Sequence, residues 1–130
     1  MNPKVVAAAI IRRDGEILIA RRRVGLKLAG YWEFPGGKVE PNETPQQCLE
    51  RELLEELGVV SHAGEIVAES DYAYEHGYFK ILAINAQLED LNFFLTVHDQ
   101  AVWVKVEDLL HYRLLPADLS IVEKLQKEIW

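Results

Sequence analysis

Cysteine, long apolar runs and basic charge are all scarce in this sequence. One cysteine among 130 residues excludes an internal disulfide. The apolar run at residues 5–11 is closed by Arg12, Arg13 and Asp14 before it could form a signal core or span a bilayer. The net charge of −7, from 14 basic and 21 acidic residues, argues against a general binder of nucleic-acid polymers, which needs a basic face. We therefore expect no membrane association and a cytoplasmic setting.

The composition is otherwise that of a soluble globular protein. The chain is 49% hydrophobic and 27% charged, and its length suits one compact domain over residues 1–130, as a monomer or a homodimer. Cys48 lies between apolar residues of a predicted helix, where a buried structural thiol is favoured over a nucleophile. Acidic residues crowd between Glu40 and Glu56, which suggests a cation site that would help an anionic substrate to bind.

The pattern of apolar residues and turns predicts strands flanked by two helices. Strands at residues 4–12 and 16–22 should pair around the turn Asp14-Gly15, followed by a loop at 25–30, a short aromatic strand at 31–34 and a break at Pro35-Gly36-Gly37. Further strands are expected at residues 59–73, 78–88 and 101–106, with turns near His76-Gly77 and at 89–92, a short helix near Glu107 and a closing helix at 119–129. The fold class is therefore an α/β sandwich with a mixed sheet between helices.

One helix, at residues 45–57, is marked at both ends. Thr44 is a candidate N-cap, with Pro45 at the first helical position and Gln47 completing a capping box, and Gly58 is the stop signal. An apolar stripe formed by Leu49, Leu53 and Leu57 should face the sheet.

The same helix carries three carboxylates, Glu52, Glu55 and Glu56, at spacings of i, i+3 and i+4. Like charges at this spacing repel, so the side chains are either dispersed in solvent or held together by a cation. The preceding glycine pair, Gly36-Gly37, favours the second alternative, because a glycine loop lets backbone come close to a ligand. Oxygen ligands of this kind suit Mg²⁺ or Mn²⁺.

These residues resemble the complete signature of the Nudix superfamily. Gly37, then Glu43 after five residues, and the segment Arg51-Glu52-Leu53-Leu54-Glu55-Glu56-Leu57-Gly58-Val59 after seven more, match its fixed positions over 23 residues. The segments 5–22, 32–38 and 115–118 also resemble the MutT branch and its cytidine-triphosphate-cleaving relatives.

The resemblance implies a metal-dependent pyrophosphohydrolase that cuts a nucleoside triphosphate into a monophosphate and pyrophosphate, in a Nudix α/β/α sandwich. Its expected substrates are damaged or modified nucleotides, such as 8-oxo-dGTP or a modified cytidine triphosphate, and its expected role is cleansing of the nucleotide pool. It places the Gly36 carbonyl, Glu52, Glu55 and Glu56 around the cations, with Glu52 as the residue usually assigned as general base. Arg51 and Glu43 would orient the loop and the helix.

Three further residues are candidates for substrate binding. Arg22 corresponds to an arginine that faces the phosphates in MutT-like enzymes, although a strand-end arginine is often only solvated. Phe34 either lies against the base or fills the core. Asp118 either reads the base, where it would accept from an exocyclic amine or, if protonated, donate to guanine, or it caps the final helix.

The sequence departs from the resemblance at Val97. Relatives usually have a glutamate there, before a histidine and six residues ahead of a tryptophan, and valine cannot bind metal. Its task would be left vacant or pass to Asp99, His98 or water, although a lone loop histidine is more often a surface residue. Two alternatives remain: a Nudix hydrolase for another diphosphate, such as ADP-ribose or a dinucleoside polyphosphate, or a non-catalytic nucleotide-binding module.

Overall fold

A computed structural model describes residues 4–74 and 77–128 of the chain. Its helices and strands follow in the order β1 (Lys4–Ile10), β2 (Arg12–Arg13), β3 (Glu16–Arg22), β4 (Trp32–Glu33), β5 (Gly36–Lys38), α1 (Pro45–Leu57), β6 (Ser61–Tyr74), β7 (Gly77–Leu88), β8 (His98–Lys105), η1 (Val106–His111), η2 (Pro116–Asp118) and α2 (Leu119–Gln126), where η1 and η2 are 3₁₀ helices.

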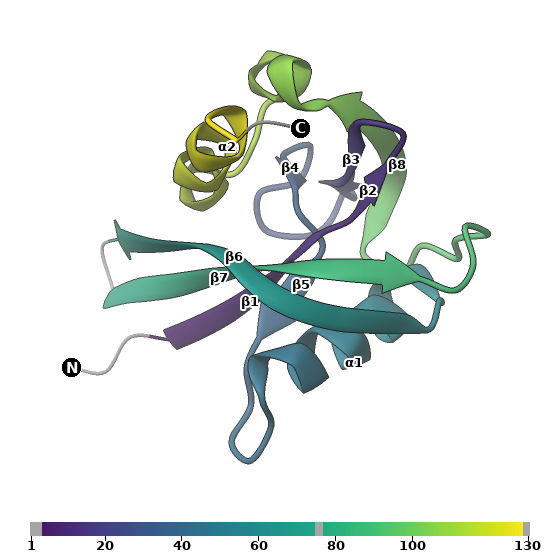
Figure 1. Cartoon of the computed structure of the whole chain (residues 1–130), viewed down its shortest axis with the longest axis vertical. Helices are drawn as coiled ribbons and strands as arrows, with labels where there is room; N and C mark the ends of the chain where they lie inside the picture. Colours follow the sequence, from purple (N-terminus) through teal and green to yellow (C-terminus); the bar gives the residue numbers. More distant parts are fainter. Residues whose placement is uncertain (1–3, 75–76, 129–130) are drawn as a thin grey trace.

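The strands form two sheets (Figure 1). The larger one has the order β5-β1-β7-β6, with β1 parallel to β7 over seven residue pairs and the other pairs antiparallel. In the smaller antiparallel sheet β3 pairs with β2, β4 and β8. The mixed sheet confirms the predicted one, whereas the second sheet was not separately predicted.

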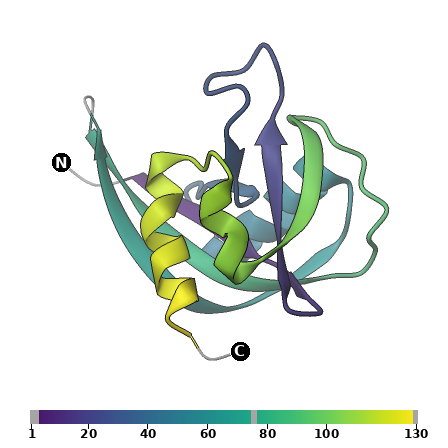
Figure 2. The same cartoon turned by 90° about the horizontal axis from the view of Figure 1, so that it is seen from above.

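Side chains alternate across β1 and face a helix on each side. Ala7 and Ala9 belong to the core cluster that contains the α1 leucines, while Ala8 and Ile10 pack in the cluster that contains Ile121 and neighbouring α2 residues. The helices therefore cover opposite faces of the mixed sheet, as Figure 1 shows, and Figure 2 shows α2 beside η1 on its own face. The α/β/α sandwich is confirmed.

Two local predictions were wrong. The single strand predicted for residues 4–12 is divided at Ile11, so only Arg12 and Arg13 pair with β3 across the predicted turn, and β1 pairs with β5 and β7 instead. The glycines predicted as a break form β5, because the absence of side chains lets this short strand lie against β1.

The C-terminal part agrees with the sequence pattern. The helix near Glu107 is η1, and α2 begins at Leu119 as predicted and ends at Gln126. The predicted end of this helix at Ile129, and His76 in the predicted turn, lie outside the described residues. Within residues 4–74 and 77–128, the helices are too short to cross a bilayer.

Candidate functional site

The glycines of β5 bring backbone close to both β1 and α1. A Cβ on Gly36 would lie 1.9 Å from the Ala7 carbonyl oxygen, so any side chain at this position would collide with β1. The Gly36 amide donates a hydrogen bond to Glu56 Oε1 over 3.3 Å. The glycine pair therefore places loop backbone beside a helix carboxylate.

Local sequence signals set the ends of α1 and so the positions of its glutamates. Thr44 accepts from the Gln47 amide and Gln47 returns a hydrogen bond to the Thr44 amide, while Gly58 ends the helix with φ 71°. Cys48 is fully buried, and burial raises the pKa of its thiol to about 12. The thiol is therefore structural, as the sequence favoured.

Arg51 connects the loop before the helix to the first carboxylate. Its guanidinium donates to both carboxylate oxygens of Glu43, over 2.7 and 3.2 Å, and to Glu52 over 2.8 Å. The hydrogen bond from Arg51 lowers the pKa of Glu43 to about 2. This fork geometry agrees with the orienting roles that the resemblance implied for Arg51 and Glu43.

The three helix carboxylates are not equivalent. Glu52 packs against Gly37, and Glu56 lies beside Gly36, where burial, and then the charges of Glu33 and Glu52, raise the pKa of Glu56 to about 9. The Glu55 side chain is 59% exposed, with Arg51 at 3.6 Å. The structure thus brings Glu52 and Glu56 together at the glycine strand and leaves Glu55 in solvent.

The donor set fits a divalent cation, although it is not gathered into a finished coordination shell. Over residues 4–74 and 77–128, no group of three or more His, Cys, Asp and Glu residues is arranged to hold a metal ion. Burial is the main cause of the raised pKa of Glu56, and the charges of Glu33 and Glu52 add to it. A cation would relieve this repulsion, since carboxylates must be deprotonated to bind it. Rotation of Glu55 would supply a third carboxylate from the same helix face.

Sequence reasoning missed Glu33, which lies at the centre of a partly buried polar network. Its Oε2 atom is 2.8 Å from His98 Nε2 and 3.3 Å from Arg22 Nη1. The charge of Glu33 also contributes to the raised pKa values of Glu56 and Asp118. The available signal was its position as the only acidic residue in the segment 32–38 that carries the family resemblance.

His98 is not the surface residue that the sequence favoured. It is 3% exposed and begins β8, where pairing with β3 turns its ring inward toward Glu33. Asp99 turns the other way and binds Arg21 Nε over 2.7 Å, and Val97 supplies a carbonyl that accepts from the Arg23 amide. Of the two side chains suggested as substitutes for the missing glutamate, His98 contacts Glu33, whereas Asp99 binds Arg21.

Arg22 is held rather than loosely solvated. Its Nε donates to the Lys27 carbonyl over 2.7 Å and its Nη1 to Glu33, and the side chain remains 24% exposed. Its neighbours are directed elsewhere: Arg21 binds Asp99, and Arg23 binds the Thr96 carbonyl.

Phe34 and Asp118 meet through a backbone contact. The Phe34 side chain is 3% exposed and belongs to the core cluster on the α2 side, which was one of its two predicted roles. Asp118, 6% exposed, accepts from the Phe34 amide over 3.3 Å and makes no capping hydrogen bond to α2. Burial, and then the charge of Glu33, raise the pKa of Asp118 to about 7. The capping role is therefore wrong for this side chain.

Thr96 forms hydrogen bonds to the C-terminal turn of α1, and sequence reasoning missed this residue too. Its hydroxyl donates to the Glu55 carbonyl over 2.9 Å, and its amide donates to the Glu56 carbonyl over 3.3 Å. These carbonyls are among the four that a helix leaves unpaired at its C-terminus. The segment after β7 thus fixes the helical turn that carries two of the three glutamates.

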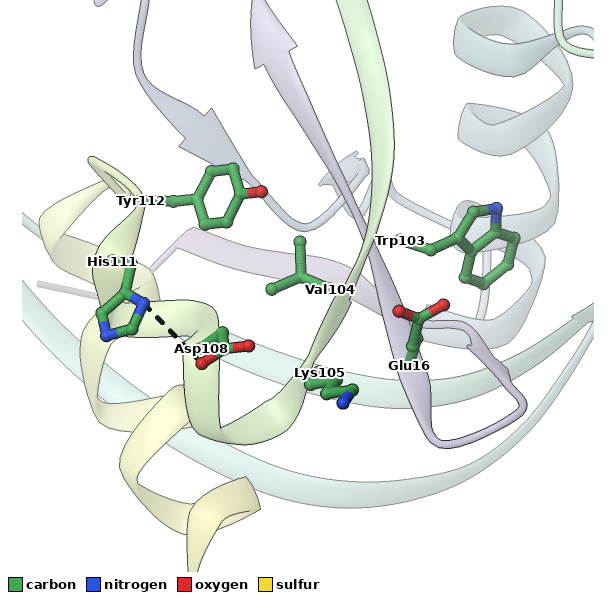
Figure 3. Close-up of a pocket in the computed structure, with 7 residues that line it drawn as sticks. All are labelled: Glu16, Trp103, Val104, Lys105, Asp108, His111 and Tyr112. Carbon is green, nitrogen blue, oxygen red and sulfur yellow. Dashed lines mark ion pairs between the residues drawn. The ribbon is translucent and has the colours of Figure 1, made fainter.

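A separate hollow lies between β8 and η1 (Figure 3). It has a volume of about 400 Å³, and Asp108 and His111 approach within 3.7 Å at its rim. None of the site residues described above lines it. Its lining residues are Glu16, Trp103, Val104, Lys105, Asp108, His111 and Tyr112.

Comparison with known proteins agrees with this geometry. Residues 1–125 match the model of the NUDIX domain. The chain is 43% identical over 121 residues to a CTP pyrophosphohydrolase of Escherichia coli, covering 91% of this chain and 87% of that protein. It is 33% identical to an 8-oxo-dGTP diphosphatase of Haemophilus influenzae, covering 98% of this chain and 96% of that protein.

Solved structures show the same fold. The solution structure of the E. coli ORF135 protein superposes with a TM-score of 0.84 at 40% identity, covering 97% of this chain and 90% of that one. The crystal structure of a MutT NUDIX hydrolase from Burkholderia pseudomallei gives a TM-score of 0.82 at 26% identity, covering 96% of this chain and 99% of that one.

Proposed function

This chain belongs to the NUDIX family, and we propose that it is a metal-dependent pyrophosphohydrolase that converts a nucleoside triphosphate and water into a monophosphate and pyrophosphate. The observation that carries the proposal is the packing of Glu52 and Glu56 against Gly37 and Gly36, the first two residues of β5. Two carboxylates pressed together in this way favour a bound divalent cation.

The roles of the helix residues follow from their contacts. The Gly36 carbonyl, Glu52, Glu55 and Glu56 would hold Mg²⁺ or Mn²⁺, which when bound neutralises charge on the phosphoryl oxygens and lowers the pKa of a coordinated water. Glu52 is the candidate base that accepts the water proton, and Arg51 keeps its carboxylate turned toward β5. Glu56 must release its proton before it can act as a ligand, because its pKa is about 9 without a cation.

In this proposal Arg22 and Asp118 bind different parts of the substrate. Arg22, whose side chain at the end of β3 is 24% exposed, would bind the phosphates. Asp118 would read the base, since at a pKa of about 7 both its accepting and its donating forms exist near neutral pH. Phe34 contributes its backbone amide, which orients Asp118, while its side chain stays in the core.

The substrate class is that of the relatives. Those named CTP pyrophosphohydrolase and 8-oxo-dGTP diphosphatase cover most of this chain, which supports an oxidised or modified nucleoside triphosphate as its substrate. We propose that residues 1–130 form one catalytic domain in the cytoplasm, monomeric or homodimeric, that cleanses the nucleotide pool.

Pyrophosphate release in Mg²⁺ from 8-oxo-dGTP, dCTP, 5-methyl-dCTP, dATP and ADP-ribose tests the proposal. We expect metal-dependent release from one or more triphosphates and none from ADP-ribose, which would instead yield two monophosphates if it were cleaved. Saturable nucleotide binding without any release would overturn the proposal in favour of a binding module.

A further inference from the structure

His98 is joined to Arg22 through a single carboxylate. The two residues face each other in the register of β8 and β3, and Glu33 of β4 lies between them with His98 Nε2 at 2.8 Å and Arg22 Nη1 at 3.3 Å from the same oxygen. A carboxylate can only accept hydrogen bonds, so the histidine nitrogen is the donor. Side chains from β3, β4 and β8 thus share one carboxylate oxygen.

The histidine ring has one polar anchor. It is 3% exposed, and its other nitrogen, Nδ1, is buried without a hydrogen-bond partner in the part of the chain that the structure describes. A buried polar atom left unpaired costs free energy, so the ring is not there for packing alone. The hydrogen bond to Glu33 is therefore the polar interaction that this ring makes among the described residues.

We propose that His98 is a positioning residue for hydrolysis, which holds Glu33 so that Arg22 presents its guanidinium to the substrate phosphates. The proposal rests on the phosphate-binding role of Arg22 in the proposed function. His98 contacts neither substrate nor metal in this scheme.

His98 can affect Arg22 because both residues bind the same oxygen of Glu33. With His98 in place, Glu33 is fixed from one side and offers Arg22 one hydrogen bond, which leaves other guanidinium donors for phosphate. Without the histidine donor, Glu33 is free to turn and engage Arg22 with both oxygens, as carboxylates and guanidinium groups prefer. The arginine would then be withdrawn from the phosphates, and substrate binding would weaken more than the chemical step.

His98→Leu and His98→Gln test this role with steady-state kinetics on the best triphosphate. We expect His98→Leu to raise KM about 10-fold with kcat changed less than about 2-fold, and His98→Gln, which keeps a donor, to restore most of the loss. His62→Leu is the matched control, because His62 of β6 lies 2.6 Å from Glu89 in an exposed pair, and the substitution should leave both constants unchanged. A fall in kcat alone, or no rescue by glutamine, would overturn the proposal.

A double-mutant cycle asks whether the effect passes through Glu33. In a Glu33→Leu background, His98→Leu should no longer change KM, and an equal effect in both backgrounds would overturn the proposal. Calorimetric binding of tripolyphosphate with Ca²⁺ gives the same comparison without turnover. If the wild-type chain released no pyrophosphate, the proposed function would fail, while weaker tripolyphosphate binding by His98→Leu would still support the positioning role and unchanged binding would refute it.

Discussion

Gly37 lies directly against the Glu52 carboxylate, so closely that a Cβ at this position would be 2.4 Å from Glu52 Cδ. The carboxylate thus occupies the space that any other residue would fill with its side chain. Because Glu52 is also bound by Arg51, its carboxylate is held between a helix residue and a strand backbone. The position of the Glu52 carboxylate therefore depends on the absence of a side chain at Gly37.

Gly37→Ala should consequently remove activity without unfolding the protein. The clashing atoms belong to the end of a flexible side chain, so Glu52 can swing away at little cost to the free energy of unfolding, while turnover falls about 100-fold or more. Steady-state turnover and urea unfolding check the two effects. Gly64→Ala is the matched control, since its Cβ would meet only the Asn85 carbonyl at 3.7 Å and activity should persist.

Glu56→Gln should separate activity from stability. Glutamine keeps an oxygen that accepts from the Gly36 amide but cannot carry the charge that binds a cation, so Mg²⁺-dependent turnover should fall by at least about 100-fold. Without metal, wild-type stability decreases as pH rises from about 4.5 toward about 9, because the folded state holds the Glu56 proton that the unfolded state releases. The variant lacks this loss, so at alkaline pH its free energy of unfolding should at least match that of the wild type.

Urea unfolding in a chelator and Mg²⁺-dependent kinetics measure these two effects. Glu65→Gln, an exposed substitution on β6, should change neither. Full turnover by Glu56→Gln would contradict the assignment of Glu56 as a metal ligand.

Asp118→Asn should change the pH dependence of the free energy of unfolding. The pKa of Asp118 is raised from 3.8 to about 7, so the wild type loses stability as pH rises between about 4 and 7, whereas the asparagine variant does not titrate. The variant should gain relative stability through this window, up to roughly 4 kcal/mol above it. A difference that stays constant across the window would argue against a raised pKa.

The same variant tests base recognition. If Asp118 reads the base, Asp118→Asn should change the ranking of 8-oxo-dGTP, dCTP, 5-methyl-dCTP and dATP in kcat/KM, because an amide replaces a titrating carboxyl. An unchanged ranking would leave Asp118 with the role of fixing the Phe34 backbone.

Thr96→Val should loosen the last turn of α1. The substitution keeps the shape of the side chain but removes its hydrogen bond to the Glu55 carbonyl, which should cost about 1 kcal/mol of stability. The half-saturating Mg²⁺ concentration should rise, because Glu55 and Glu56 lie on this turn. Thr96→Ser retains the hydroxyl and should behave like the wild type, and an unchanged Mg²⁺ dependence in Thr96→Val would show that the turn is held by other contacts.

Local signals explain why the sequence predicted α1 so well. Thr44, Gln47 and Gly58 act on neighbouring backbone, and the helix begins and ends where they indicate. The candidate site residues on this helix, and the orienting roles of Arg51 and Glu43, were instead indicated by the resemblance to the Nudix signature; the structure shows that Arg51 binds Glu43.

Pairings between distant strands explain what the sequence did not predict. Strand β1 pairs with β7 rather than with its neighbour in the chain, and no local signal encodes that choice. Glu33 and His98 are 65 residues apart, so their contact exists only after β4 and β8 have both joined β3. The burial of His98 and the true partner of Asp118 depend on such tertiary contacts.

The parallel pairing of β1 with β7 also sets an order of events during synthesis. Strand β5, with its two glycines, is held against one edge of β1, and the other edge of β1 is unsatisfied until residues 77–88 exist. A nascent chain that ends before β7 therefore contains α1, β1, β5 and β6. It lacks the strand that joins β1 to β6 and that adds Leu82, Ile84 and Ala86 to the core cluster around α1. The mixed sheet is therefore completed late, when more than half of the polypeptide has already been made.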